Sequence, residues 1–124
     1  MYGVKRLQKD LEDMNYSVEV LTGSDTQLYV IIRDYEIELG RFTGQVIDLG
    51  IMAMTNYPQG VPSAVHVLAN PQLIEITENI PNVRNIQASP LGSEWRYWSK
   101  NFNWDGERST RRLISQINTI FKDA

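Results

Sequence analysis

Apolar residues recur at helical spacing near each end of the chain. In the first stretch they alternate with charged residues and stand three and four positions apart, at Val4, Leu7, Leu11 and Met14. The second stretch follows a turn at Asp105-Gly106 and a capping residue at Ser109 or Thr110. Its apolar face is formed by Leu113, Ile114, Ile117, Ile120 and Phe121. The spacing predicts one amphipathic helix at each end.

Between these helices the pattern changes to the alternation and short apolar runs of β-strands. Residues 17–21 and 28–32 flank turn residues at 23–25 and predict a hairpin. Further strands are expected at residues 35–39, 46–54 and 64–68, although the bounds of 35–39 are soft, so the pattern gives four or five strands.

Residues 70–94 carry three prolines and four asparagines without a sustained period, which predicts a long irregular loop with short ordered pieces. The whole order is an N-terminal helix, a four-stranded antiparallel meander, a long loop and a C-terminal helix. Helices segregated from strands in this way indicate the α+β class. At 124 residues the chain can bury one sizeable core, so we expect a single domain over residues 1–124.

Composition narrows the classes of function. A net charge of −3 provides no strong positive field for a phosphate backbone, so we expect no nucleic-acid partner. No apolar run approaches the roughly 20 residues that span a bilayer, and the start has no apolar signal region. We therefore expect a cytoplasmic protein without a membrane partner. Because cysteine is absent and histidine occurs once, we expect neither a metal site nor a cofactor.

A turn motif and an aromatic patch are the most informative local features. Residues 55–62 (TNYPQGVP) follow one predicted strand and precede another, and they look like the Tyr-Pro-x-x-x-Pro turn of the ubiquitin-conjugating fold. Residues 93–104 (SEWRYWSKNFNW) resemble the tryptophan-bearing end of that family's long loop, and are similar to bacterial members encoded beside ubiquitin-like modifiers. The order of elements resembles the family over nearly the whole chain, which implies a UBC-like fold.

The resemblance implies two partners, a ubiquitin-like modifier and an adenylating activating enzyme. In conjugating enzymes the N-terminal helix is where the ubiquitin-fold region of the activating enzyme docks. The basic residues of the helix here are Lys5, Arg6 and Lys9. The other interpretation, which an exposed charged helix face favours without any partner, is that these residues are simply solvated.

The motif residues also allow two interpretations. The two prolines fix φ and withhold amide donors, so the motif either shapes the turn or contacts a partner. These residues are Tyr57, Pro58 and Pro62. Trp98 and its aromatic neighbours either complete a core under a loop or form a partner-binding surface.

Conjugating enzymes carry the modifier as a thioester on a cysteine, and this chain has none. By spacing, the equivalent position falls between Ile86 and Ser99. The small residues in that range are Ala88, Ser89, Ser93 and Ser99. An asparagine amide near the cysteine stabilises the oxyanion in such enzymes. The candidates for that role are Asn79, Asn82 and Asn85.

Three explanations for the missing cysteine stay open. The natural protein lacks it, a serine carries the modifier as an oxyester, or an engineered change replaced it. A serine hydroxyl needs a nearby base, yet the single histidine, His66, lies on a strand before the loop. We interpret His66 as a strand residue satisfied by a backbone group or by water.

The sequence therefore supports rival functions. The first is a conjugating-enzyme-like component of a bacterial ubiquitin-like modifier pathway, plausibly in antiviral defence, with transferase activity only if a nucleophile is present. The alternative is a non-catalytic binding module, similar to cysteine-less UBC variants and to RWD domains that share the turn. A third is an α+β adaptor in which the turn motif arose by chance.

Overall fold

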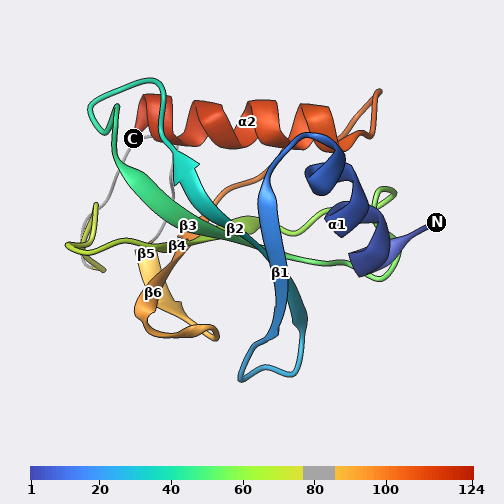
Figure 1. Ribbon diagram of the computed structural model, residues 1–124, viewed down its shortest axis with the longest axis horizontal. Coiled ribbons are helices and arrows are strands. Elements are labelled where there is room, and N and C mark those ends of the chain that lie inside the picture. Colours follow the sequence, from blue (N-terminus) through green and yellow to red (C-terminus); the bar gives the residue numbers. More distant parts are fainter. Residues whose placement is uncertain (77–85) are drawn as a thin grey trace.

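The computed structural model describes residues 1–76 and 86–124, whose backbone forms two helices and six strands (Figure 1). The helices are α1 (Gly3–Asp13) and α2 (Thr110–Asp123). The strands are β1 (Ser17–Thr22), β2 (Leu28–Glu36), β3 (Val46–Met52), β4 (Ala64–Leu68), β5 (Ile86–Ser89) and β6 (Gly92–Ser99). Both predicted helices and the α+β class are confirmed.

The described strands form one antiparallel sheet in the order β1-β2-β3-β4-β6-β5. The predicted four-stranded meander corresponds to its first four strands, but the sheet is wider, because β6 pairs with β4 and β5 pairs with β6. Residues 86–89 and 92–94 of the stretch predicted as irregular belong to β5 and β6, which are ordered pieces of the kind expected there, although their pairing with the sheet was not predicted. Pro90 lies in the turn of this hairpin. β5 alternates over only four residues before this proline, and β6 begins with glycine and two polar residues, so the sequence pattern does not clearly mark either strand.

β2 is longer than predicted and takes in part of the strand expected at residues 35–39. Its pairing with β3 shifts register between Ile32 and Tyr35, and Asp34 in that interval has a φ of 56°. A bulge of this kind re-aims the side chains that follow it. Tyr35 and Ile37 accordingly return to the core, at 3% and 2% exposure. A separate third strand at residues 35–39 is therefore not formed.

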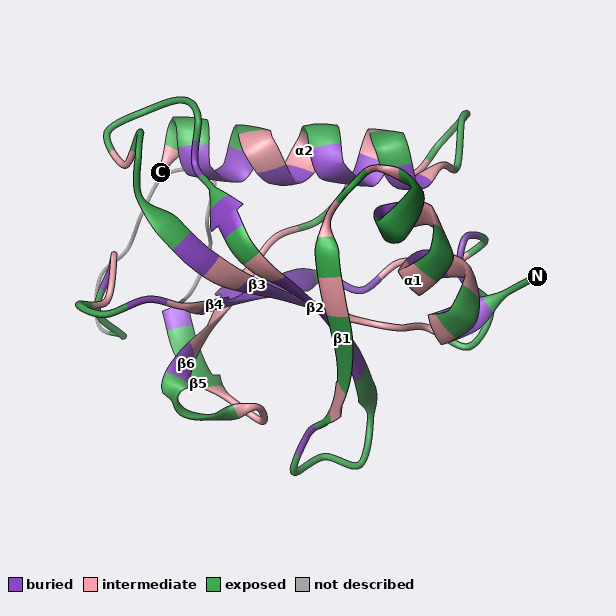
Figure 2. Ribbon diagram, viewed as in Figure 1, coloured by how far each residue is buried: buried purple, intermediate pink, exposed green. Residues whose placement is uncertain are grey.

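Both helices pack on one face of the sheet. In Figure 1 α2 runs across the strands, and Figure 2 shows that its buried residues lie on the side facing them. The Ser109 side chain caps α2 by accepting a hydrogen bond from the backbone N–H of Arg112 at 3.2 Å. From α1, Leu7 and Leu11 are fully buried in the same core. The buried residues of α2 are Thr110, Leu113, Ile114, Ile117, Ile120 and Phe121.

The opposite face of the sheet carries a smaller apolar cluster built on Tyr29, Ile31 and Trp95. The β1–β2 and β5–β6 turns both extend to the side away from α2 (Figure 1). They meet where the backbone N–H of Ser24 donates to the carbonyl of Pro90 at 2.9 Å. The two hairpins thus partly enclose the strand residues that face away from the helices. In the described parts of the chain, no helix is long and apolar enough to cross a membrane.

Candidate functional site

The Tyr-Pro turn lies between β3 and β4 and packs against the start of α1. The Tyr57 carbonyl accepts a hydrogen bond from the backbone N–H of Gly3 at 2.9 Å, and the peptide bond between Tyr57 and Pro58 is cis. The side chains of Tyr57, Pro58 and Pro62 are buried. These three side chains therefore shape the turn, and the structure does not support their direct contact with a partner.

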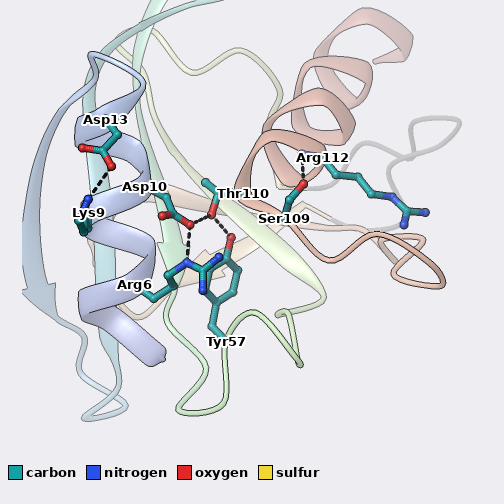
Figure 3. Close-up of polar contacts among 8 residues, drawn as sticks. All are labelled: Arg6, Lys9, Asp10, Asp13, Tyr57, Ser109, Thr110 and Arg112. Carbon is teal, nitrogen blue, oxygen red and sulfur yellow. Dashed lines mark hydrogen bonds and ion pairs between the residues drawn. The ribbon is translucent and has the colours of Figure 1, made fainter. Parts of the chain in front are cut away.

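A chain of polar contacts joins this turn to both helices (Figure 3). The hydroxyls of Tyr57 and Thr110 lie 2.5 Å apart, and Thr110 donates to Oδ2 of Asp10 at 2.7 Å. Nε of Arg6 donates to the same carboxylate oxygen at 2.8 Å. Because the single hydroxyl proton of Thr110 goes to Asp10, the Tyr57 hydroxyl is the donor to Thr110. Burial raises the pKa of Tyr57 to about 12, so it stays protonated in this role.

The three basic residues of the predicted docking face differ in their surroundings. Arg6 is held by Asp10, and Nζ of Lys9 forms an ion pair with Oδ2 of Asp13 at 2.7 Å (Figure 3). Lys5 is exposed, and none of the ion pairs among the described residues involves it. Lys5 is therefore the cation on α1 whose charge is not locally neutralised.

A surface groove of about 350 Å³ lies beside the turn. Nε1 of Trp104 donates to the Pro58 carbonyl at 2.7 Å, and Nη1 of Arg108 donates to Oε1 of Gln59 at 2.8 Å. These contacts tie the turn to the segment that precedes α2. The turn is thus fixed on both sides, by α1 and by residues 104–108.

The small residues at which a catalytic cysteine was expected all lie on the β5–β6 hairpin, in different surroundings. Ala88 on β5 and Ser93 on β6 are exposed. Ser99 is the last residue of β6 and is half-buried. Ser89 is the last residue of β5 and is also half-buried. The predicted oxyanion residues lie outside the described residues: Asn79, Asn82 and Asn85.

Of these four positions, Ser89 is the one whose side chain meets the histidine. Its hydroxyl oxygen lies 2.8 Å from Nδ1 of His66 and accepts the backbone N–H of Leu91 at 3.1 Å. The partner of Nδ1 is therefore a side chain and not the backbone group or water that we expected for His66. Its partner is a side chain 23 residues further along, which strand pairing brings onto the same face of the sheet.

His66 is held in an aromatic environment at the centre of β4. Its ring is in edge-to-face contact with Tyr29 and Tyr97, at centroid distances of 4.9 and 5.4 Å, and the residue is 4% exposed. Burial lowers the pKa of His66 to about 4, while the Asp25 carboxylate opposes this shift in part. The Tyr29 hydroxyl in turn donates to Asp25 at 2.7 Å. The imidazole is therefore neutral at pH 7, which is the form in which a ring nitrogen can accept a hydrogen bond or a proton.

A cavity of about 220 Å³ opens beside this ring. Asp25, Tyr29 and Tyr97 line it together with His66 and Pro90. His66 belongs both to the lining of this cavity and to the contact with Ser89, and Pro90, which follows Ser89 in the sequence, also lines the cavity. Apolar walls with a few convergent polar groups are typical of ligand-binding sites.

Two tryptophans of the aromatic patch at residues 93–104 are buried. Trp98 is 1% exposed, and its ring centroid lies 5.3 Å from that of Phe121 on α2. Trp95 belongs to the smaller cluster on the opposite face and is 6% exposed. Of the two interpretations, core packing is the one the structure supports for both tryptophans, and Trp98 presents almost no surface to a partner.

Residues 5–123 match the family described as Prokaryotic E2 family E. The chain belongs to this family. The matched span contains the Tyr-Pro turn, the polar chain in Figure 3 and the serine–histidine contact. No curated protein and no solved structure matches the chain.

Membership in prokaryotic E2 family E supports the resemblance to ubiquitin-conjugating proteins at the level of the family. This family member has no cysteine, so any acyl group that it carries must be bound through an atom other than a thiol sulfur. No cluster of three or more metal-ligating side chains occurs in residues 1–76 and 86–124.

Proposed function

We propose that this prokaryotic E2 family E protein is a ubiquitin-conjugating-like component of a bacterial ubiquitin-like modifier pathway. It receives or positions the modifier that an adenylating activating enzyme delivers. The family match over residues 5–123 carries the proposal. The buried Tyr-Pro turn, together with a sheet preceded by α1 and followed by α2, supports a UBC-like fold. The proposal includes a cytoplasmic setting and a role in antiviral defence.

The proposed docking face for the activating enzyme is the exposed side of α1. The polar chain from Arg6 through Asp10 and Thr110 to Tyr57 fixes this helix against the turn and against α2. A rigid helix with an exposed Lys5 suits an acidic patch on a partner, because the helix backbone is already ordered before binding.

A second candidate function is a non-catalytic binding module that holds the modifier or a partner without a covalent bond. The absence of cysteine favours this second function, because conjugating enzymes normally use a cysteine as the nucleophile. The two candidates share the docking face and differ in whether a covalent adduct forms.

Binding to the activating enzyme and the ubiquitin-like protein of the same genome tests the proposal, by isothermal titration calorimetry on the full chain. We expect Lys5→Glu to weaken binding to the activating enzyme about tenfold, because it places like charges together. Lys122→Glu makes the same change at an exposed position on α2 and serves as the control.

Either of two results would count against this account. Failure of the wild-type chain to bind both proteins contradicts the proposed function. Equal weakening by Lys122→Glu and Lys5→Glu contradicts the assignment of the docking face while leaving the function in place.

A further inference from the structure

We infer that Ser89 is the acyl acceptor of this protein and that His66 accepts the hydroxyl proton as the ester forms. The inference rests on the proposed function and names the atom on which the modifier would be carried. Its basis is the contact of 2.8 Å between Oγ of Ser89 and Nδ1 of His66. A serine hydroxyl is a weak nucleophile until an adjacent base accepts its proton, and this contact supplies the required geometry.

The hydroxyl of Ser89 is held in place by the hairpin itself. Ser89 lies directly before the β5–β6 turn, and the backbone N–H of Leu91 donates to its oxygen at 3.1 Å. The N–H of Leu91 occupies one lone pair of the Ser89 oxygen and leaves the other lone pair free to attack the acyl carbon. In the reactive form the imidazole carries its proton on Nε2, and Ser89 donates to Nδ1.

His66 is oriented by its neighbours on three elements. Tyr29 on β2 and Tyr97 on β6 contact the ring edge to face, and Asp25 in the β1–β2 turn is the nearby carboxylate. Burial keeps the ring neutral at pH 7, which leaves Nδ1 able to accept a hydrogen bond from Ser89, but the same burial disfavours the imidazolium that forms when the proton is transferred. Once the imidazolium forms, the Asp25 carboxylate stabilises it by charge attraction.

The other hydroxyls of the region lack this arrangement. Ser93 is exposed on β6, where its carbonyl accepts a hydrogen bond from Arg96. Ser99 ends β6 in register with Ala64. Since the chain has one histidine and its Nδ1 contacts Ser89, neither of these serines has an imidazole base.

The proposed donor is the carboxyl terminus of the modifier, activated as an acyl adenylate. Oγ of Ser89 forms a bond to the acyl carbon, the bond from that carbon to the phosphate oxygen breaks, and AMP leaves. The hydroxyl proton passes to Nδ1 of His66 and then to water. An amine of the final acceptor next attacks the ester, the bond to Oγ breaks, and Ser89 regains a proton.

The cavity beside His66 provides a place for the end of the modifier. Its volume of about 220 Å³ suits a few residues of extended chain, and its wall includes both His66 and Pro90. His66, which contacts the Ser89 hydroxyl, is the lining residue that connects this cavity to the proposed acceptor.

Charging of the full chain with the activating enzyme, the ubiquitin-like protein and ATP tests the inference by intact-protein mass spectrometry. We expect a wild-type adduct that resists reducing agent and is cleaved by hydroxylamine. Ser89→Ala should abolish the adduct, and Ser93→Ala, which removes an exposed hydroxyl on the same hairpin, should leave it unchanged. His66→Gln should slow its formation about 100-fold, which is within the range for loss of a general base.

A second variant separates loss of the base from loss of the fold. A thiol ionises far more readily than a hydroxyl and depends less on a base. The double variant Ser89→Cys with His66→Gln should therefore regain an adduct, now labile to reducing agent. An uncharged double variant, together with an adduct on Ser89→Cys alone, would show that loss of His66 disrupts the site and would overturn the assignment of His66 as a base from the His66→Gln result.

A probe that needs no partner protein gives an independent reading. p-Nitrophenyl acetate should acetylate Ser89 faster than Ser93, and His66→Gln should remove that difference. Equal acetylation of the two serines in the wild-type chain would overturn the assignment of an activated hydroxyl.

The remaining outcomes distinguish this inference from the proposed function. An adduct that survives Ser89→Ala overturns the inference while supporting the function. A wild-type chain that binds both partners but forms no ester overturns the inference and favours the binding module. A chain that binds neither partner overturns both.

Discussion

At the scale of single residues, the burial of His66 has the clearest effect on the free energy of unfolding. The folded protein holds it neutral, with a pKa lowered from 6.5 to about 4 because the ring is buried. The unfolded chain therefore binds more protons between pH 6.5 and 4, so the folded state loses stability as the pH falls through that interval. A serine hydroxyl and two tyrosine rings surround the ring, and the nearby Asp25 carboxylate offsets the cost of its protonation only in part.

We predict that the free energy of unfolding falls by about 3 kcal/mol from this residue alone between pH 6.5 and 4. Carboxylates titrate in the same interval, so the relevant quantity is the difference between the wild-type chain and His66→Gln, measured by urea unfolding at each pH. The variant should lose less stability over the interval. Parallel curves for the two proteins would show that His66 is not buried in its neutral form.

The serine–histidine contact could not be predicted from the sequence, although part of the signal was present. His66 alternates with Val65 and Val67, which places it on the opposite face of β4 from the main core. Its partner lies on β5, and that strand was not recognised because it has only four residues and directly precedes a proline. Only the pairing of β5 with β6 and of β6 with β4 brings Ser89 to the ring.

At the scale of elements, the helices were predictable because their apolar positions follow a period that few other arrangements produce. Ser109 was one of two capping candidates, and it caps α2 in the structure. The strands β1 to β4 were predictable from alternation or from a continuous apolar run. The bulge at Asp34 was not predictable. The sequence pattern on its two sides is the same as the pattern of two separate strands.

Helix α2 offers a direct test of how the core is packed. Ile117 is fully buried on the face of α2 that packs on the sheet, so Ile117→Asp should cost several kcal/mol of unfolding free energy by burying an unpaired charge. Ser115→Asp introduces the same residue at an exposed position of the same helix and should change stability little. The measurement is the midpoint of urea unfolding. Equal midpoints for Ile117→Asp and the wild-type chain would contradict the packing of α2.

At the scale of the whole molecule, two surfaces with separate tasks lie on different parts of the fold. The exposed side of α1, fixed by the Tyr57–Thr110–Asp10 contacts, is the proposed site for the activating enzyme. The face of the sheet turned away from α2 carries His66, Ser89 and the cavity between two hairpins. In the proposed function, the activating enzyme docks at the first surface and the modifier is held at the second.

The most direct test of the account is a charging assay on variants that each contain a single cysteine, with the activating enzyme, the ubiquitin-like protein and ATP. The variants are Ala88→Cys, Ser89→Cys, Ser93→Cys and Ser99→Cys. Ser89→Cys should form the most abundant adduct sensitive to reducing agent, because this position adjoins His66 and the cavity. Failure of every variant to form an adduct would contradict a conjugating-type acyl acceptor and leave the non-catalytic binding module.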